Sequence, residues 1–170
     1  RGLIVQNHEY TDDGLLFPDG VTNWSADKTA KSLAAHGVSV IEVRRRRSGW
    51  EVVRPSRYAR RITGATPTVI GGPAAGHPLL QTSADPSGTA VLGTLNNCAM
   101  GYTPWGTYLA CEENFNGYFV KTGAPNDLEK RYGIGAGFGY LWHTTDSRFQ
   151  VDAEPNECNR FGYVVEIDPF

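Results

Sequence analysis

The pattern of hydrophobic and polar positions predicts a chain built mostly from short β-strands. Residues 38–43 alternate with period two, and a turn at Ser48-Gly49 leads into the apolar-rich residues 50–53, which together predict a β-hairpin. The 20 glycines and 10 prolines are spread along the chain and favour short strands joined by turns over long helices. Similar runs predict further strands at 3–5, 68–70, 90–95, 107–113, 118–121 and 161–167.

One segment, Asp27–His36, has the composition of a helix. Ser25 or Asp27 is placed to cap its first turn, small residues fill its middle, and Gly37 is placed to end it. The helix would have about three turns at most. We therefore predict a mostly β fold with one short helix.

The spacing of the predicted strands is typical of two architectures. Regularly spaced short strands with long polar, glycine-rich connections occur in β-propellers and in β-sandwiches, and no internal repeat in the sequence separates the two. The glycine-rich residues 133–139 partly match a nucleotide-binding loop, but they lack a preceding apolar strand and a following helix. We interpret them as a turning loop.

Composition and charge exclude several classes of protein. A hydrophobic content of 40%, a charged content of 20% and a net charge of −2 describe a soluble globular chain with no bulk electrostatic partner. We therefore expect no nucleic-acid partner, and we interpret Arg44–Arg47 as the solvated end of the hairpin. Uncharged stretches are interrupted well before the roughly 20 apolar residues that a membrane helix requires, so no membrane span is expected.

The ends of the chain look cut. The sequence begins with Arg1, directly before a strand-like run, and stops just after the strand-like residues 163–167, without an initiator methionine or a signal peptide. We therefore expect residues 1–170 to be one partial domain, truncated at both ends.

Polar side chains with ligand atoms follow the first predicted strand. The segment Asn7-His8-Glu9-Tyr10 comes directly after the apolar residues 3–5, and active sites often lie at such strand ends. Glu9 is a candidate metal ligand or catalytic carboxylate, and the alternative is a hydrogen-bonded loop carboxylate. His8 has no histidine partner at ligand spacing, so we interpret it as structural.

Residues 93–119 contain the densest set of chemically useful side chains. They include the amide pair Asn96-Asn97, the thiol of Cys98 and the carboxylate pair Glu112-Glu113. Carboxylate and amide oxygens are preferred ligands of Ca²⁺, whereas a thiolate suits a softer ion such as iron or zinc. The segment therefore suggests a mixed metal site.

Strand geometry assigns the two glutamates different roles. If residues 107–113 form a regular strand, Cys111 and Glu113 share one face and Glu112 lies on the other, unless a bulge brings both glutamates to one side. The alternative for the cysteines is a disulfide between Cys98 and Cys111, or two small buried side chains. Three cysteines in the chain cannot all pair internally.

At these residues the sequence resembles the PhoX alkaline phosphatase family of secreted bacterial proteins. The segments that carry the resemblance run in order along the chain, at 7–10, 34–43, 60–63, 72–76, 93–119 and 159–169. The combination of Asn-Asn-Cys-Ala, Thr-Pro-Trp-Gly-Thr and Cys-Glu-Glu-Asn-Phe is long enough to be specific. Met100 stands where the family usually has glycine.

The resemblance implies part of a β-propeller whose central site holds Ca²⁺ together with Fe³⁺ and hydrolyses phosphate monoesters at alkaline pH. Carried over to this chain, it makes Cys98 the thiolate ligand to iron and makes Glu9 and Glu113 carboxylate ligands, with Glu112 as a further candidate. Clustered cations would neutralise the phosphoryl oxygens while a metal-bound oxo or hydroxide group attacks phosphorus. No catalytic side chain is assigned, and His36 and His143 are interpreted as structural.

The resemblance also implies a periplasmic or secreted protein, monomeric when complete. Family members are far longer than this chain, so we expect their remaining ligands to lie outside it and the isolated piece to be inactive. Two alternatives stay open at this point: a calcium-dependent esterase or lactonase on a propeller, which needs no thiolate ligand, and a non-catalytic calcium-binding module in which the paired glutamates brace loops.

Overall fold

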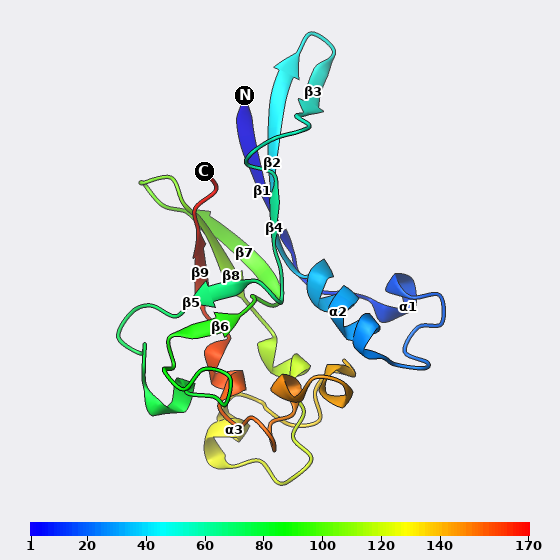
Figure 1. Ribbon diagram of the computed structural model, residues 1–170, viewed down its shortest axis with the longest axis vertical. Coiled ribbons are helices and arrows are strands. Elements are labelled where there is room, and N and C mark those ends of the chain that lie inside the picture. The colour runs from blue at the N-terminus through cyan, green and yellow to red at the C-terminus, as the bar shows by residue number, and fades with distance from the viewer.

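The structure is a computed structural model that describes all 170 residues, and its fold is mostly β, with 28% of residues in strands and 21% in helices. The strands form three open antiparallel sheets, as expected of a fragment of a β-propeller (Figure 1). The strands are β1 (Gly2–His8), β2 (Gly37–Arg46), β3 (Gly49–Val52), β4 (Arg60–Ile62), β5 (Pro67–Val69), β6 (Ala90–Leu92), β7 (Asn97–Tyr102), β8 (Tyr108–Glu112) and β9 (Val164–Ile167).

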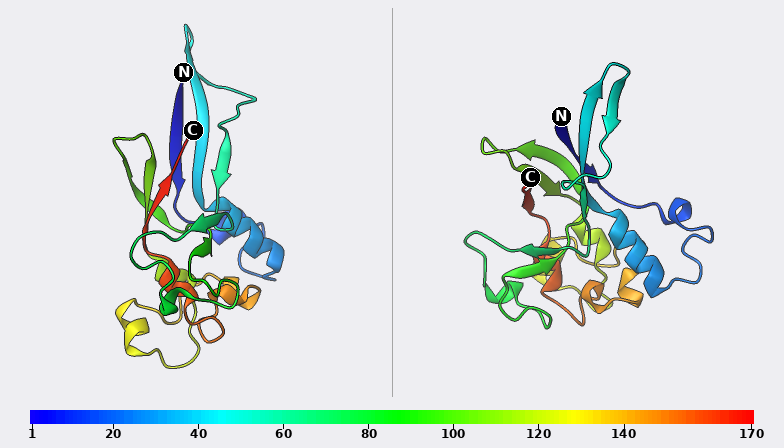
Figure 2. Two further views of the ribbon diagram at one scale, coloured as in Figure 1. Left: turned by 60° about the vertical axis from the view of Figure 1, so that its left-hand side comes forward. Right: turned by 45° about the horizontal axis from the view of Figure 1, so that its top comes forward.

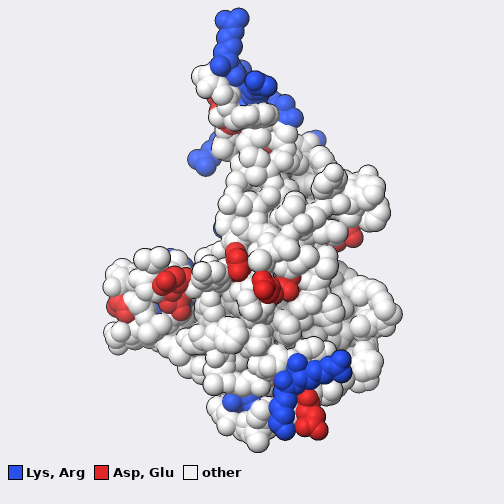
Figure 3. Space-filling model, turned by 180° about the vertical axis from the view of Figure 1, so that it is seen from behind, with Lys and Arg blue, Asp and Glu red and all other residues white.

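The first sheet is centred on the long strand β2. β1 pairs along it from Gly2 opposite Val43 to His8 opposite Gly37, and β3 and β4 share its other edge. The predicted β2–β3 hairpin is confirmed, and it projects away from the rest of the chain (Figures 1 and 2). Residues 45–47 at its tip are exposed, and basic side chains gather there in Figure 3, as predicted for a solvated hairpin end.

The other two sheets are smaller. β5 pairs with β6, and β8 lies between β7 and β9. A small core of Val38, Tyr108, Ala110 and Ile167 packs the first sheet against the third. This contact brings the end of β1 close to β7, and the candidate site lies there.

The predicted helix is confirmed as α2 (Ala26–Ala35). The Oγ atom of Ser25 caps it by accepting a hydrogen bond from the Lys28 N–H at 3.3 Å. Gly37 follows with φ +98°, and a Cβ atom there would lie 2.1 Å from the carbonyl oxygen of Ile62, so only glycine fits. The prediction of a single helix was incomplete, because the structure adds α1 (Asp13–Leu16), α3 (Asp127–Arg131) and several single-turn 3-10 helices.

The larger core lies in the second half of the chain, beneath the sheets. It is strongly aromatic, with Tyr118, Phe119, Trp142 and Phe149 almost fully buried. The predicted strand at 118–121 is wrong: Phe115–Tyr118 is a 3-10 helix, and Val120 makes only isolated bridges to Gly135 and Gln150. The apolar run reflects burial on all sides within this core and not the pairing of a strand.

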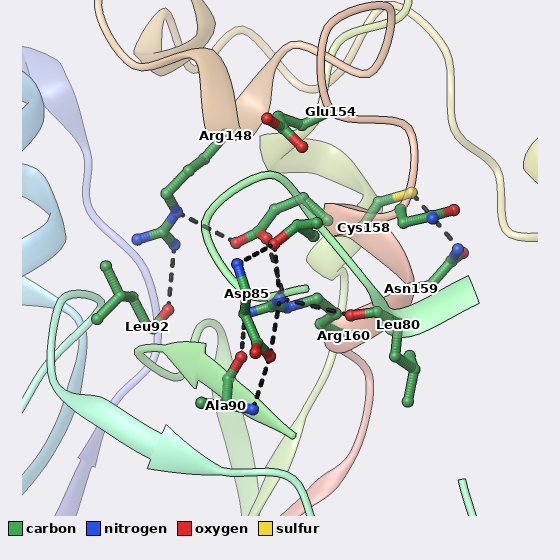
Figure 4. Close-up of polar contacts among 12 residues, drawn as sticks. Leu80, Asp85, Ala90, Leu92, Arg148, Glu154, Cys158, Asn159 and Arg160 are labelled. Carbon is green, nitrogen blue, oxygen red and sulfur yellow. Dashed lines mark hydrogen bonds and ion pairs between the residues drawn. The ribbon is translucent and has the colours of Figure 1, made fainter. Parts of the chain in front are cut away.

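A buried arginine connects the C-terminal segment to the loop before β6 (Figure 4). The Arg160 guanidinium lies 3.4 Å from Glu157 and 3.6 Å from Asp85, and it donates a hydrogen bond to Thr82 at 2.9 Å. Arg148 approaches the other Glu157 oxygen at 3.2 Å, so each buried charge has a partner of opposite sign. None of the helices has the length and apolar character of a membrane-spanning segment.

Candidate metal centre

Three side chains with metal-ligand atoms converge between β1, β7 and β8. One atom each from Glu9, Cys98 and Glu113 lies within 4.8 Å of the other two. Metal-ligand bonds to oxygen and sulfur are about 2.0–2.6 Å long, so a single ion could lie within reach of all three. The structure thus brings together three of the four predicted ligands, from positions far apart in the sequence.

Asn7 holds the end of β1 against β7 and so places Glu9. Its Nδ2 donates hydrogen bonds to the carbonyl oxygens of Cys98 at 3.0 Å and of Ala99 at 3.4 Å, and its Oδ1 accepts one from the hydroxyl of Tyr108 at 2.9 Å. Glu9 follows two residues later, just past the end of β1. The side chain of Asn7 therefore links β1 to the backbone at the candidate thiolate.

A β-bulge places Cys98. Asn97 pairs with Glu112 and Met100 pairs with Ala110, so Cys98 and Ala99 lie opposite the single residue Cys111. Such a bulge re-aims a side chain that would otherwise follow the regular alternation of the strand. The thiol of Cys98 is exposed at the cluster.

The charges at the cluster act directly on the thiol of Cys98. A hydrogen bond with Glu113 is the largest cause that raises its pKa, followed by partial desolvation and by the negative charges of Glu9 and Glu113. Two carboxylates oppose a third negative charge beside them, whereas a bound cation favours the thiolate. The same arrangement therefore suits a cation that the three groups share.

Glu112 lies outside the cluster. Its Oε1 accepts hydrogen bonds from the Thr94 hydroxyl at 2.8 Å and the Leu95 N–H at 3.1 Å, and its Oε2 accepts from the N–H groups of Gly162 at 2.8 Å and Tyr163 at 3.2 Å. Burial raises the pKa of this carboxyl group, although these hydrogen bonds oppose the shift. Glu112 thus braces the loop before β7 and the residues just before β9, whereas Glu113, just past β8, reaches the cluster as the strand alternation predicts.

The remaining cysteines and histidines lie outside the cluster. All three cysteines are free thiols, so the structure contains no disulfide between Cys98 and Cys111. The Nε2 atom of His8 lies 2.7 Å from the hydroxyl oxygen of Ser39 on β2, and His36 is fully buried beside Tyr118. His8 and His36 therefore have structural contacts, as interpreted from the sequence.

The sequence named one further side chain at the site, Asn96, only as part of an amide pair and gave it no role of its own. Asn96 is buried, and its Oδ1 has no hydrogen-bond partner. The residue lines a cleft of about 470 Å³ together with Glu9, Asn114 and Tyr118. The only signal for it in the sequence was the amide pair beside Cys98.

These side chains fit the ions that the family resemblance implies. Two carboxylates are hard oxygen ligands suited to Ca²⁺, and the thiolate is a soft ligand suited to iron. The unpaired amide oxygen of Asn96, a residue that lines the same cleft as Glu9, is a neutral oxygen of the kind that Ca²⁺ also accepts. An amide oxygen buried without a partner is costly in a protein interior, and a cation or its bound water would satisfy it.

Comparisons with known proteins point to one family. The family profile described as alkaline phosphatase PhoX matches residues 1–170. The solved structure of Pseudomonas fluorescens PhoX in complex with vanadate, a transition state analogue, is 52% identical and superposes with a TM-score of 0.95. The match covers 99% of this chain and 30% of that chain, so this chain spans about 30% of the length of the solved relative. No curated protein sequence matches the chain.

Proposed function

The chain belongs to the PhoX alkaline phosphatase family, and we propose that it supplies part of the metal centre of an alkaline phosphatase that hydrolyses phosphate monoesters. The observation that carries this proposal is the convergence of Glu9, Cys98 and Glu113 within 4.8 Å. The Pseudomonas fluorescens relative binds vanadate, a transition state analogue, which supports chemistry at a phosphoryl group in this chain as well.

We assign the metal ions as Ca²⁺ and Fe³⁺. The carboxylates of Glu9 and Glu113 would hold either ion through oxygen, and the sulfur of Cys98 would hold iron. When bound, the ions supply positive charge that stabilises the transition state of phosphoryl transfer. Glu112 is left out of the ligand set, because both of its oxygens already accept hydrogen bonds from the protein.

Two side chains prepare this site for ion binding. Asn7 fixes the distance between Glu9 and Cys98, and Glu112 keeps Glu113 on the opposite side of β8. Cys98 must lose the proton on its Sγ to bind a metal, so ion binding releases a proton to water. The cleft beside Glu9 and Asn96 offers the substrate a partly enclosed space next to the ligands.

What we propose for the whole protein rests on its family membership. We propose a periplasmic or secreted enzyme that is monomeric when complete, acts on a phosphate monoester and has no nucleic-acid partner. Basic side chains gather at the hairpin tip, away from the cluster, and the net charge of −2 offers no general attraction to polyanions.

Replacement of the thiol tests the proposed site directly. In the intact protein, Cys98→Ala should abolish the bound iron and the hydrolysis of a phosphate monoester together, because the iron loses its soft ligand. Cys158→Ala is the control, since that thiol is buried in the larger core outside the cluster, and it should keep both properties. Normal iron content and phosphatase activity in Cys98→Ala would refute the assignment.

A further inference from the structure

We infer that Asn96 presents its side-chain oxygen to the bound metal ions or to a water molecule on them, and that Tyr118 and His36 hold the amide in this orientation. This inference rests on the proposed metal centre. It concerns a neutral residue whose role follows from a chain of hydrogen bonds that runs from α2 to the site.

Asn96 is placed beside two of the proposed ligands. It precedes Cys98 by two residues, and its carbonyl oxygen accepts a hydrogen bond from the Glu113 N–H at 2.9 Å. Only 5% of the residue is exposed, and it lines the same cleft as Glu9. Its side chain has one paired end, Nδ2, and one unpaired end, Oδ1.

The orientation of the Asn96 amide follows from the positions of the protons in the hydrogen bonds that link His36, Tyr118 and Asn96. The Ser32 carbonyl oxygen can only accept, so the Nδ1 of His36, 2.7 Å away, carries the imidazole proton. Burial lowers the pKa of His36 to about 4, so the ring is neutral and its Nε2 has no proton. Nε2 therefore accepts a hydrogen bond from the Tyr118 hydroxyl at 2.9 Å.

The direction of the Tyr118–His36 hydrogen bond determines which end of the Asn96 amide faces Tyr118. Burial raises the pKa of Tyr118, so the hydroxyl keeps its proton at neutral pH and donates it to His36. The phenolic oxygen can then only accept from Asn96, and Nδ2 donates to it at 2.9 Å. The amide nitrogen is thereby fixed on the tyrosine, which leaves the oxygen as the end of the side chain that is free for a ligand.

Aromatic packing holds the side chains of these hydrogen bonds in place. The Tyr118 ring stacks on Tyr140 with a centroid distance of 4.4 Å, and the ring of His36 meets it edge-on at 5.2 Å. An amide rotated by 180° would point its NH₂ group at the cation and its oxygen at the phenolic oxygen of Tyr118, whose proton is already donated to His36, so neither end would be satisfied. A neutral oxygen of this kind is a common ligand of Ca²⁺ or a partner of its bound water.

Removal of the amide is the first test. Asn96 has φ +50°, a left-handed backbone that glycine adopts without strain, so Asn96→Gly deletes the side chain and keeps the backbone. Calorimetric titration of the metal-free intact protein with Ca²⁺ should show affinity reduced by about 10-fold to 100-fold, the usual effect of losing such a partner.

The orienting role is tested at Tyr118 with a matched tyrosine. Tyr118→Phe keeps the ring but frees the amide to rotate, so Ca²⁺ affinity should fall by about 10-fold. Tyr140→Phe removes a hydroxyl from the same aromatic stack, one that donates to the carbonyl oxygen of Thr11 at 3.3 Å and not to Asn96 or His36, and it should leave the affinity unchanged. An equal loss in both variants would overturn the inference, because it would indicate general damage to the core.

A rescue experiment separates orientation from packing. A carboxylate presents an oxygen in either rotation, so Asn96→Asp should raise Ca²⁺ affinity more in the Tyr118→Phe background than in the wild type, and an equal gain in both backgrounds would contradict the role. Wild-type affinity in Asn96→Gly and Tyr118→Phe, with loss in Glu113→Gln, would refute the inference and leave the metal centre standing. Wild-type affinity in Glu113→Gln as well would refute both.

Discussion

The contrast between Glu112 and Glu113 gives a quantitative prediction. Replacement of Glu112 should reduce local stability, whereas replacement of the adjacent Glu113 should reduce metal binding. Glu112→Gln keeps the size of the side chain but leaves an amide where four donors converge. In either orientation of that amide at least one backbone N–H loses its acceptor, and the other hydrogen bonds lose the charge that strengthens them. Burial raises the pKa of Glu112, so removal of its charge regains the free energy spent on desolvating the carboxylate and offsets part of the loss of hydrogen bonds. We expect a net loss of about 2 kcal/mol of local stability.

Hydrogen exchange of the intact protein measures this loss at the amides concerned. A loss of about 2 kcal/mol corresponds to roughly 30-fold faster exchange, since each 1.4 kcal/mol is a factor of ten, and peptides containing Leu95, Gly162 and Tyr163 should report it. Glu113→Gln should leave these rates unchanged and lower metal content instead, because Glu113 is exposed and accepts no backbone N–H. Unchanged exchange in Glu112→Gln, or equal acceleration in both variants, would refute the division of roles.

Two further predictions concern the loop before β6. The Ser87 hydroxyl and the N–H groups of Ala90, Thr89 and Ser87 lower the pKa of Asp85 to about 2. The contribution of this carboxylate to stability is therefore present above about pH 4 and is lost as the pH falls towards 2. Hydrogen exchange of residues 85–90 between pH 5 and pH 2 should show this loss in the wild type and not in Asp85→Asn. Arg160→Met should destabilise the intact protein by about 3–5 kcal/mol in denaturant unfolding, because Asp85 loses its ion-pair partner and Glu157 loses one of its two arginine partners. The matched substitution Arg45→Met, at an exposed arginine, should change stability by less than about 0.5 kcal/mol. Similar effects of the two arginine substitutions would contradict the structural role of the buried guanidinium.

The elements that local patterns specify were predictable from the sequence. The β2–β3 hairpin follows from period-two alternation and a turn, and α2 follows from Ser25 at its start and Gly37 after its end. α3 was missed although it carries a readable signal, the capping box formed by Asn126 and Glu129.

Elements that depend on the tertiary structure were not predictable in the same way. β7 starts with polar residues and contains the bulge at Cys98, so it lacks the regular alternation of a strand. Residues 118–121 read as a strand because they are apolar, but their burial comes from the aromatic core. A short apolar run does not by itself distinguish these two environments.

The candidate site was predictable in part. The separation of Glu113 from Glu112 followed from strand alternation, but the proposed iron-binding role of Cys98 came from family resemblance, because the sequence alone left a disulfide with Cys111 or a small buried side chain as alternatives. The proximity of Glu9 depends on Asn7 across more than 90 residues of sequence, and the orientation of Asn96 depends on His36 and Tyr118. Such contacts exist only in the folded chain.

The central claim is that Cys98 binds iron together with Glu9 and Glu113, and X-ray absorption at the iron edge of the purified intact protein tests it most directly. The account predicts a single sulfur neighbour at about 2.3 Å, a length typical of a metal-thiolate bond, among oxygen neighbours, and it predicts that this sulfur signal and the iron are both absent in Cys98→Ala. Iron surrounded only by oxygen and nitrogen in the wild-type protein would contradict the account.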